Sequence, residues 1–102
     1  MMKKELFAIT TYCSLHGIDH SFITSLRDEG LISITIENDD EFIEEDQLPE
    51  LENYTRWHHE MGINTEGIDA IRHLLNRLRQ AQAELNLLKN RLRLFEEGGD
   101  SP

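Results

Sequence analysis

The C-terminal third of this chain repeats apolar residues with the seven-residue period of a coiled coil. Both seam positions of the heptad, a and d, stay apolar through four heptads. The a residues are Ile71, Leu78, Leu85 and Leu92, and the d residues are Leu74, Ala81, Leu88 and Phe95. A seam of this length predicts a helix over residues 65–97 that packs against another helix. We therefore expect these eight residues to form the dimerisation seam of a homodimer.

The predicted helix is long in comparison with the rest of the chain. About 32 residues at 1.5 Å each give about 48 Å, more than a core of about 60 residues covers. A helix that folds back on its own domain remains the alternative. Additional leucines outside the seam, Leu75, Leu87 and Leu94, indicate more than one packing partner. The expected organisation is an acidic domain over residues 1–63, a coiled-coil helix over 64–97 and a disordered tail over 98–102.

Two short helices are expected near the N-terminus. Residues 10–16 form the first, with Thr10 as N-cap, and residues 20–29 form the second, with Asp19 as N-cap. Gly17 lies in the connection between them, and Gly30 ends the second helix. Two short helices joined by a turn with glycine are typical of a helix-turn-helix.

A hairpin and a third helix are expected next. Residues 31–36 are rich in β-branched side chains, residues 37–40 are polar, and residues 41–43 form a second short strand. A hairpin after a helix-turn-helix is a wing. Glu45 or Asp46 then caps a helix that accepts Pro49 in its first turn and ends at Gly62. The predicted fold class is mainly α, a winged helix-turn-helix with a long C-terminal helix.

The net charge of −10 is distributed unevenly along the chain. Residues 1–69 contain 4 Lys and Arg against 16 Asp and Glu, a balance of −12. Residues 70–95 contain six cations and one carboxylate, a balance of +5, and residues 96–102 add −3. An acidic domain repels nucleic acid and attracts basic protein surfaces. The simpler alternative is that the carboxylates only keep a small protein in solution.

Several function classes lack support in the sequence. No apolar stretch is long enough for a membrane span or a signal peptide, and one cysteine suits a reducing cytoplasm. Phosphate-binding glycine loops and persuasive Ser-His-Asp spacings are absent, so we expect neither an enzyme nor a cofactor. The spacing of Cys13, His16 and His20 is compatible with a metal site. A fourth ligand is missing, however, and a lone cysteine is more often a buried helix residue, so no metal is expected.

Short motifs follow one another in a defined order along the chain. They are Phe7-Ala8-Ile9-Thr10-Thr11-Tyr12-Cys13, Gly17-Ile18-Asp19, Glu29-Gly30-Leu31-Ile32, Phe42, Arg56-Trp57-His58-His59-Glu60-Met61 and Arg91-Leu92-Arg93-Leu94-Phe95. In these motifs the chain resembles MerR-type helix-turn-helix regulators over nearly its whole length, and among them the chaperone modulators that are similar to CbpM. This resemblance implies a MerR-like fold and an antiparallel pair of C-terminal helices.

The sequence departs from DNA-binding members of that superfamily in its second helix and wing. Those members have a second helix rich in Arg and Tyr and a wing with arginines. Here the second helix has one arginine, Arg27, offset by two acids, and residues 37–46 contain seven carboxylates and no cation. Direct DNA binding as a MerR-like transcriptional regulator therefore remains only the alternative.

The resemblance implies binding to the J-domain of a CbpA- or DnaJ-like co-chaperone, which blocks its action with the chaperone DnaK. J-domains engage DnaK through a basic helix, so an acidic protein suits the same face. The expected partner-binding residues are Asp39, Asp40, Glu41, Glu44, Glu45, Asp46, Glu50, Tyr54 and His58. Aromatic anchors supply most of the affinity at such surfaces, and Trp57 is a third candidate anchor. For Trp57 a place in the core is the favoured alternative.

Overall fold

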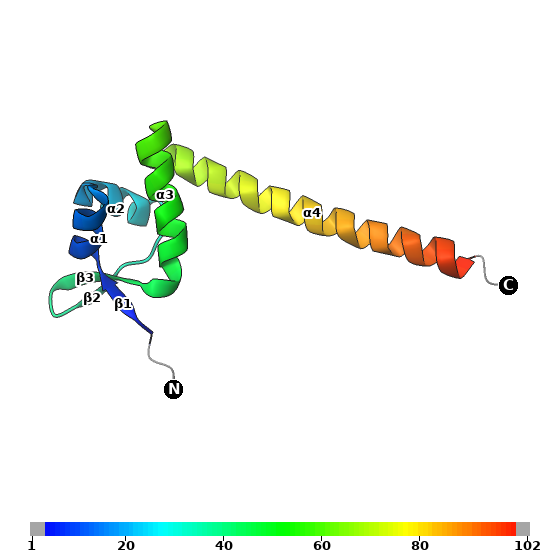
Figure 1. Cartoon of the computed structure of the whole chain (residues 1–102), viewed down its shortest axis with the longest axis horizontal. Helices are drawn as coiled ribbons and strands as arrows, with labels where there is room; N and C mark the ends of the chain where they lie inside the picture. The colour runs from blue at the N-terminus through cyan, green and yellow to red at the C-terminus, as the bar shows by residue number, and fades with distance from the viewer. Residues whose placement is uncertain (1–3, 100–102) are drawn as a thin grey trace. The chain divides into compact units, whose positions relative to one another are not determined.

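The computed structural model describes residues 4–99, most of which lie in α-helices. The predicted fold class, a winged helix-turn-helix with a small sheet and a long C-terminal helix, is confirmed (Figure 1). The chain divides into two compact units, residues 1–69 and 70–102. This division lies inside the last helix, because Ile68 in the first turns of that helix belongs to the core of the first unit.

The helix-turn-helix consists of α1 (Ile9–His16) and α2 (His20–Asp28). The N-cap of α1 is Ala8 and not the predicted Thr10, because the short strand β1 (Leu6–Ala8) leads directly into the helix. Gly17 ends α1 in the left-handed conformation, with φ 60°. Glycine adopts this conformation without the steric cost that a Cβ imposes. Asp19 is the N-cap residue of α2, as predicted, although its side chain accepts no cap hydrogen bond.

The end of α2 is a Schellman motif. The N–H of Leu31 donates to the carbonyl of Leu26 at 2.9 Å, and the N–H of Gly30 donates to that of Arg27 at 2.9 Å. Gly30 has φ 75°, and both leucines are buried. The motif therefore turns the chain and places Leu31 in the core.

The wing belongs to a three-stranded antiparallel sheet with the order β1-β3-β2. Strands β2 (Thr35–Glu37) and β3 (Asp40–Glu44) are joined by a two-residue turn, Asn38-Asp39. Both turn residues have positive φ, 52° and 66°, as a type I′ hairpin requires. Phe7 on β1 pairs with Ile43 on β3.

The predicted first strand over residues 31–36 is wrong in its N-terminal part. Leu31 and Ile32 are buried but lie outside the sheet. The side-chain amide of Gln47 replaces a neighbouring strand at Ser33. The N–H of Ser33 donates to Oε1 of Gln47 at 2.9 Å, and Nε2 of Gln47 donates to the carbonyl of Ser33 at 3.2 Å.

A short 3₁₀ turn, η1 (Glu45–Gln47), leads into α3 (Leu48–Met61). Gln47 is the N-cap residue of α3, so the predicted caps Glu45 and Asp46 lie too early in the chain. Pro49 occupies the first turn of α3, as predicted. Gly62 ends the helix with φ 65°, and the N–H of Ile63 donates to the carbonyl of Trp57 at 3.3 Å.

The core of the first unit is formed by apolar side chains from its helices and its sheet. Its buried members are Ile9, Tyr12, Ile18, Phe22, Ile23, Leu26, Leu31, Ile32, Ile43, Leu51, Tyr54 and Ile68. Helices α1, α2 and α3 thus share one core with the sheet, which fixes the wing relative to α2.

The last helix, α4 (Thr65–Gly99), begins as predicted and continues two residues beyond the predicted end. Asn64 caps it, since its Oδ1 accepts a hydrogen bond from the N–H of Gly67 at 2.8 Å. The predicted disordered tail lies in part outside the described residues. Over residues 4–99, no helix has the length and apolar character that crossing a membrane requires.

Candidate partner-binding surface

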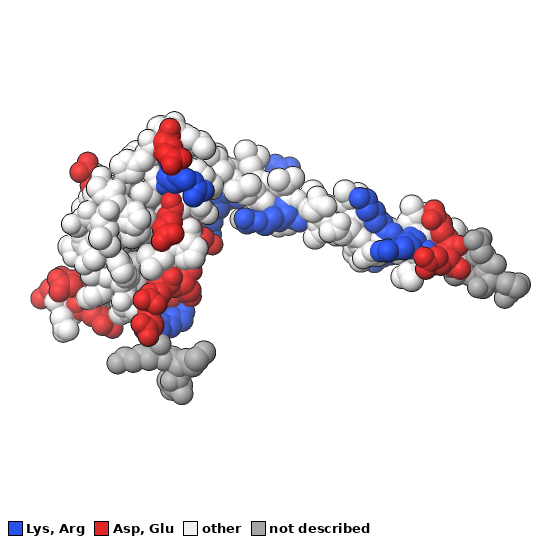
Figure 2. Space-filling model, viewed as in Figure 1, with Lys and Arg blue, Asp and Glu red and all other residues white. Residues whose placement is uncertain are grey.

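Carboxylates gather on the wing and on the segment that leads from it into α3 (Figure 2). We call this region the acidic wing surface, which comprises Asp39, Asp40, Glu41, Glu44, Glu45, Asp46 and Glu50. All seven side chains are exposed or half-buried. The hairpin places the first four on the turn and on β3, and η1 with the first turn of α3 places the others. The seven carboxylates thus follow one continuous stretch of backbone, and on β3 the side chain of Glu41 points to the opposite face of the sheet from those of Asp40 and Glu44.

Glu41 on β3 connects the acidic wing surface to α2. Its Oε1 forms a hydrogen bond with Nε2 of His20, and its Oε2 lies 3.9 Å from Nη1 of Arg27. His20 and Arg27 are separated by two helical turns, so they lie on the same side of α2. Arg27 also contacts Asp28, at 3.3 Å. The one arginine of α2 is thus held between two carboxylates of its own chain.

Lys4 is a second cation held by the acidic wing surface. Its Nζ donates to Oε2 of Glu44 at 3.1 Å. This hydrogen bond, together with the negative charges of Glu44 and Asp46, raises the pKa of Lys4 above its usual value. Asp39, Asp40 and Glu45 take no part in these contacts with Lys4, His20 and Arg27, and their carboxylates are exposed.

The three predicted aromatic anchors differ in their exposure. Tyr54 is only 4% exposed and belongs to the core, so its ring is not available to a partner on this surface. Trp57 is half-buried and packs against the same core, in agreement with the alternative given for it. His58 is half-buried as well, and its ring stacks on Phe22 with centroids 4.3 Å apart. His58 lies near the end of α3, whereas the carboxylates lie on the wing and near the start of that helix. His58 is therefore not part of the acidic wing surface.

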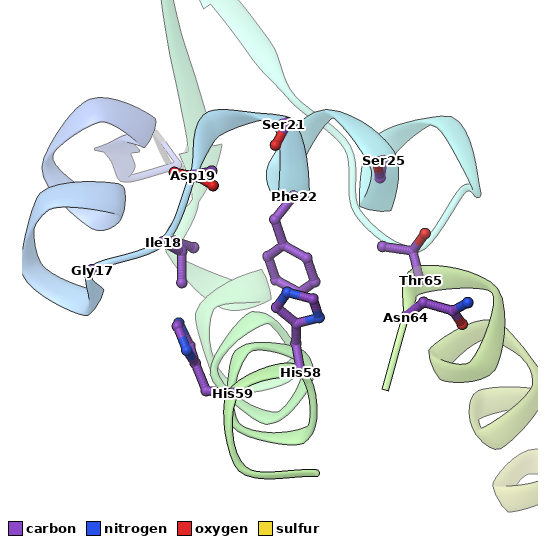
Figure 3. Close-up of a pocket in the computed structure, with 10 residues that line it drawn as sticks. All are labelled: Gly17, Ile18, Asp19, Ser21, Phe22, Ser25, His58, His59, Asn64 and Thr65. Atoms are coloured by element: carbon purple, nitrogen blue, oxygen red, sulfur yellow. The ribbon is translucent and has the colours of Figure 1, made fainter. Parts of the chain in front are cut away.

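A cleft of about 310 Å³ lies between the start of α2 and the end of α3 (Figure 3). Phe22 and His58 form its centre, with Asn64 and Thr65 on one side and His59 on the other. Nδ1 of His58 donates to the carbonyl of Ile63 at 2.9 Å. This bond fixes the ring and leaves Nε2 for another partner. Sequence reasoning missed this cleft, and the only signal for it was a pair of histidines just before a helix-ending glycine.

The candidate metal ligands of the sequence do not converge. His16 stacks on Tyr12 with centroids 4.1 Å apart, whereas His20 contacts Glu41. Cys13 is half-buried beside the core, and burial raises the pKa of its thiol. In the described part of the chain, no group of three or more His, Cys, Asp or Glu side chains is arranged to hold a metal ion.

The predicted dimerisation seam lies on the surface of α4 in a single copy. Its large apolar side chains are exposed at most positions, from 46% at Leu85 to 74% at Phe95. Ile71 is half-buried, and Ala81 is exposed. A water-exposed stripe of this length is typical of a surface that another molecule covers.

One comparison with known proteins gives a match. The sequence profile described as "MerR HTH family regulatory protein" matches residues 7–90. The match covers the helix-turn-helix, the wing, α3 and most of α4. No curated protein and no solved structure matches the chain. Because this match covers most of the chain, including its winged helix-turn-helix, the chain belongs to the MerR helix-turn-helix family of regulatory proteins.

Proposed function

We propose that this protein is a chaperone modulator that binds the J-domain of a CbpA- or DnaJ-like co-chaperone and inhibits its action with DnaK. In this proposal the regulatory fold serves to hold a protein partner. The protein acts by occupying a surface, without catalysis. The acidic wing surface is the partner-binding region.

The contact of Glu41 with His20 and Arg27 carries this proposal. A DNA-reading helix needs cations that are free to replace the counterions of phosphates. On α2 the arginine is engaged by a wing carboxylate, and the adjacent turn presents Asp39 and Asp40. Such a surface repels a phosphate backbone and attracts a basic protein helix.

The partner has a matching charge. The basic helix through which a J-domain contacts DnaK is the chemical counterpart of the acidic wing surface. Exposed carboxylates mainly accelerate association, and buried contacts supply most of the affinity. Ile36 on the wing is 67% exposed and is an apolar contact available beside the carboxylates.

Titration of the full-length protein with an isolated J-domain tests the proposal. We expect saturable binding that weakens as the salt concentration rises. Combined neutralisation by Asp40→Asn, Glu45→Gln and Asp46→Asn should slow association about tenfold and flatten its salt dependence. Asp39 is left unchanged because its positive φ makes many substitutions there costly.

The matched control neutralises three carboxylates that are not members of the acidic wing surface, with Glu60→Gln, Glu96→Gln and Glu97→Gln. This control has the same net charge as the wing variant and should keep most of the association rate. Equal losses in both variants would assign the effect to overall charge. Absence of any saturable binding at low salt would contradict the proposed partner.

A second candidate function is a transcriptional regulator that binds DNA as a dimer. The winged helix-turn-helix and the family match favour it. An electrophoretic mobility shift on random duplex DNA at low salt separates the two functions, because non-specific binding needs only phosphate contacts. A retarded complex at micromolar protein would favour the regulator, and our proposal expects none.

A further inference from the structure

The cleft between the start of α2 and the end of α3 has the character of a binding site, and it lies outside the acidic wing surface. Its volume of about 310 Å³ is at the lower end of the range for small-molecule sites. A space of this size suits one small ligand or one long side chain of a partner. The residues that line it supply a carboxylate, hydroxyls, an amide, two imidazoles and apolar surface, and none of these lining residues is Lys or Arg.

The centre of the cleft is a pair of stacked rings (Figure 3). The rings of Phe22 and His58 have centroids 4.3 Å apart and planes inclined by 18°. Ile18 lines the same cleft, and both Ile18 and Phe22 belong to the core, which holds them in place. Apolar and aromatic walls of this kind accept the methylene stem of a long cationic side chain and the flat face of a guanidinium.

The polar groups of the cleft include several hydrogen-bond acceptors. Nδ1 of His58 donates to the carbonyl of Ile63 at 2.9 Å, so in the neutral ring Nε2 is an acceptor. Asp19 lines the cleft with an exposed side chain that accepts no cap hydrogen bond from α2. The hydroxyls of Ser21 and Ser25 are acceptors as well. These groups match a ligand that is positively charged and donates several hydrogen bonds.

An anion is the main alternative ligand, because the first residues of α2 and α4 line the cleft and helix N-termini favour negative charge. At the start of α2, however, Asp19 already supplies a negative charge. At the start of α4, the side chain of Asn64 already accepts from the N–H of Gly67. Residues 1–69 carry a net charge of −12, which opposes an anion further. The charges around the cleft therefore favour a cation.

The cleft and the acidic wing surface adjoin each other along α2. His20 lies between Asp19 and Ser21 in the sequence, and its ring contacts Glu41 of β3. Asp19 and Ser21 line the cleft. Adjacent residues of one helix thus connect the two regions, so one basic partner can contact both.

We propose that this cleft receives an arginine side chain of a basic partner protein, with the guanidinium against Asp19 and Nε2 of His58 and the methylene groups against Phe22. The inference rests on the proposed function, because the arginine belongs to the basic helix that the acidic wing surface attracts. It supplies an anchor that the wing lacks, since Tyr54 is buried and exposed carboxylates mainly accelerate association. Arginine held in a pocket is a typical source of affinity at protein interfaces.

A pair of peptides tests the cleft without the co-chaperone. The probe is a capped alanine–arginine–alanine tripeptide, and its control contains citrulline, which has nearly the shape of arginine without the charge. Titration of the isotopically labelled full chain is followed by amide chemical shifts. We expect the arginine peptide to give saturable shifts at Phe22 and His58 with a dissociation constant of about 1 mM, and the citrulline peptide to give no saturation in that range.

Two outcomes of this titration would overturn the inference. Equal shifts with both peptides would show that the positive charge is not recognised. Saturation of the same amides by inorganic phosphate, without saturation by the arginine peptide, would assign the cleft to anions.

A substitution at Asp19 tests the role of its carboxylate. Asp19→Asn removes the charge and keeps a residue type that is favoured at N-caps, so α2 should remain intact. It should raise the dissociation constant of the arginine peptide about fivefold. The matched control Glu29→Gln makes the same charge change at the other end of α2 and should change the constant by less than about twofold. Equal effects of the two variants would assign the loss to overall charge and overturn the site.

The same variants separate this inference from the proposed function. In a J-domain titration, Asp19→Asn should accelerate dissociation about fivefold, and Glu29→Gln should leave it nearly unchanged. A J-domain that binds both variants equally well would overturn the arginine site and leave the proposed function intact. If the arginine peptide binds and the J-domain does not, the cleft is supported and the proposed partner is wrong.

Discussion

The hydroxyl of Tyr12 on α1 lies 2.8 Å from the hydroxyl of Thr55 on α3, and both residues are buried. Thr55 donates its own proton to the carbonyl of Leu51, 2.9 Å away, so Tyr12 is the donor between the two hydroxyls. This chain of hydrogen bonds links the helix-turn-helix to the helix behind it. It therefore adds a directional contact to the apolar packing of α1 and α3.

Removal of one hydroxyl from this pair should cost more than removal of both. Thr55→Val leaves the buried hydroxyl of Tyr12 without an acceptor and lowers the free energy of unfolding by about 1–3 kcal/mol. In the double variant with Tyr12→Phe neither hydroxyl of the pair remains. A double-mutant cycle by urea unfolding should therefore show coupling, and purely additive losses would contradict the bond.

Because the phenol of Tyr12 is buried, we expect the free energy of unfolding to fall at alkaline pH. Burial raises the pKa of its phenol above the usual 10.0. Below about pH 10 the phenol is protonated in both the folded and the unfolded chain, so it contributes no pH dependence. Above that pH the unfolded chain loses the proton first, and the free energy of unfolding falls by up to about 1.4 kcal/mol per pH unit. Tyr12→Phe should reduce this slope in urea titrations, and an unchanged slope would assign it to other groups.

Gln47 should stabilise the wing through its two hydrogen bonds to Ser33. Gln47→Ala removes both partners of the Ser33 backbone and lowers the free energy of unfolding by about 1–2 kcal/mol. Gln47→Glu keeps an acceptor for the N–H of Ser33 but sets a carboxylate oxygen against the carbonyl of Ser33, so it should not restore the wild-type stability. Amide hydrogen exchange at Ser33 reports the site directly. Protection that survives in Gln47→Ala would show that another group satisfies this N–H.

Cys13 should react slowly while the protein is folded. Burial raises the pKa of its thiol above the usual 9.0, and the charges of Asp19 and Glu41 act in the same direction. The thiolate is the reactive form. Alkylation by iodoacetamide at neutral pH should therefore be severalfold slower than in urea. Equal rates would indicate that α1 opens freely.

Patterns local to each segment predicted the helices of this protein well. The heptads placed α4, and the glycines at positions 17, 30 and 62 placed the ends of α1, α2 and α3. Each of these signals acts locally, through side-chain period or through a left-handed residue. The helical part of the fold could therefore be predicted from sequence without knowledge of distant contacts.

Elements that depend on distant contacts were predicted poorly. Strand β1 is three residues long and exists because it pairs with β3, far along the chain, as Phe7 does with Ile43. Ser33 lies outside the sheet, although a strand was predicted there, and its N–H donates to the side chain of Gln47, 14 residues away. The carboxylates of the candidate site were found from composition, whereas the burial of Tyr54 depends on how α3 packs in the shared core.

The two-residue turn at Asn38-Asp39 also limits how this wing can be altered. Side chains of a strand alternate between two faces, so an inserted residue that shifted the pairing would exchange inner and outer positions along β2. Thr35 and Ile36 would change places, and the pairing with Phe42 and Glu41 would be lost. A tag or a longer loop grafted here must therefore preserve the pairing of Glu37 with Asp40. In engineering terms, the tip has a fixed length, and its two positive-φ positions favour Asn, Asp or Gly.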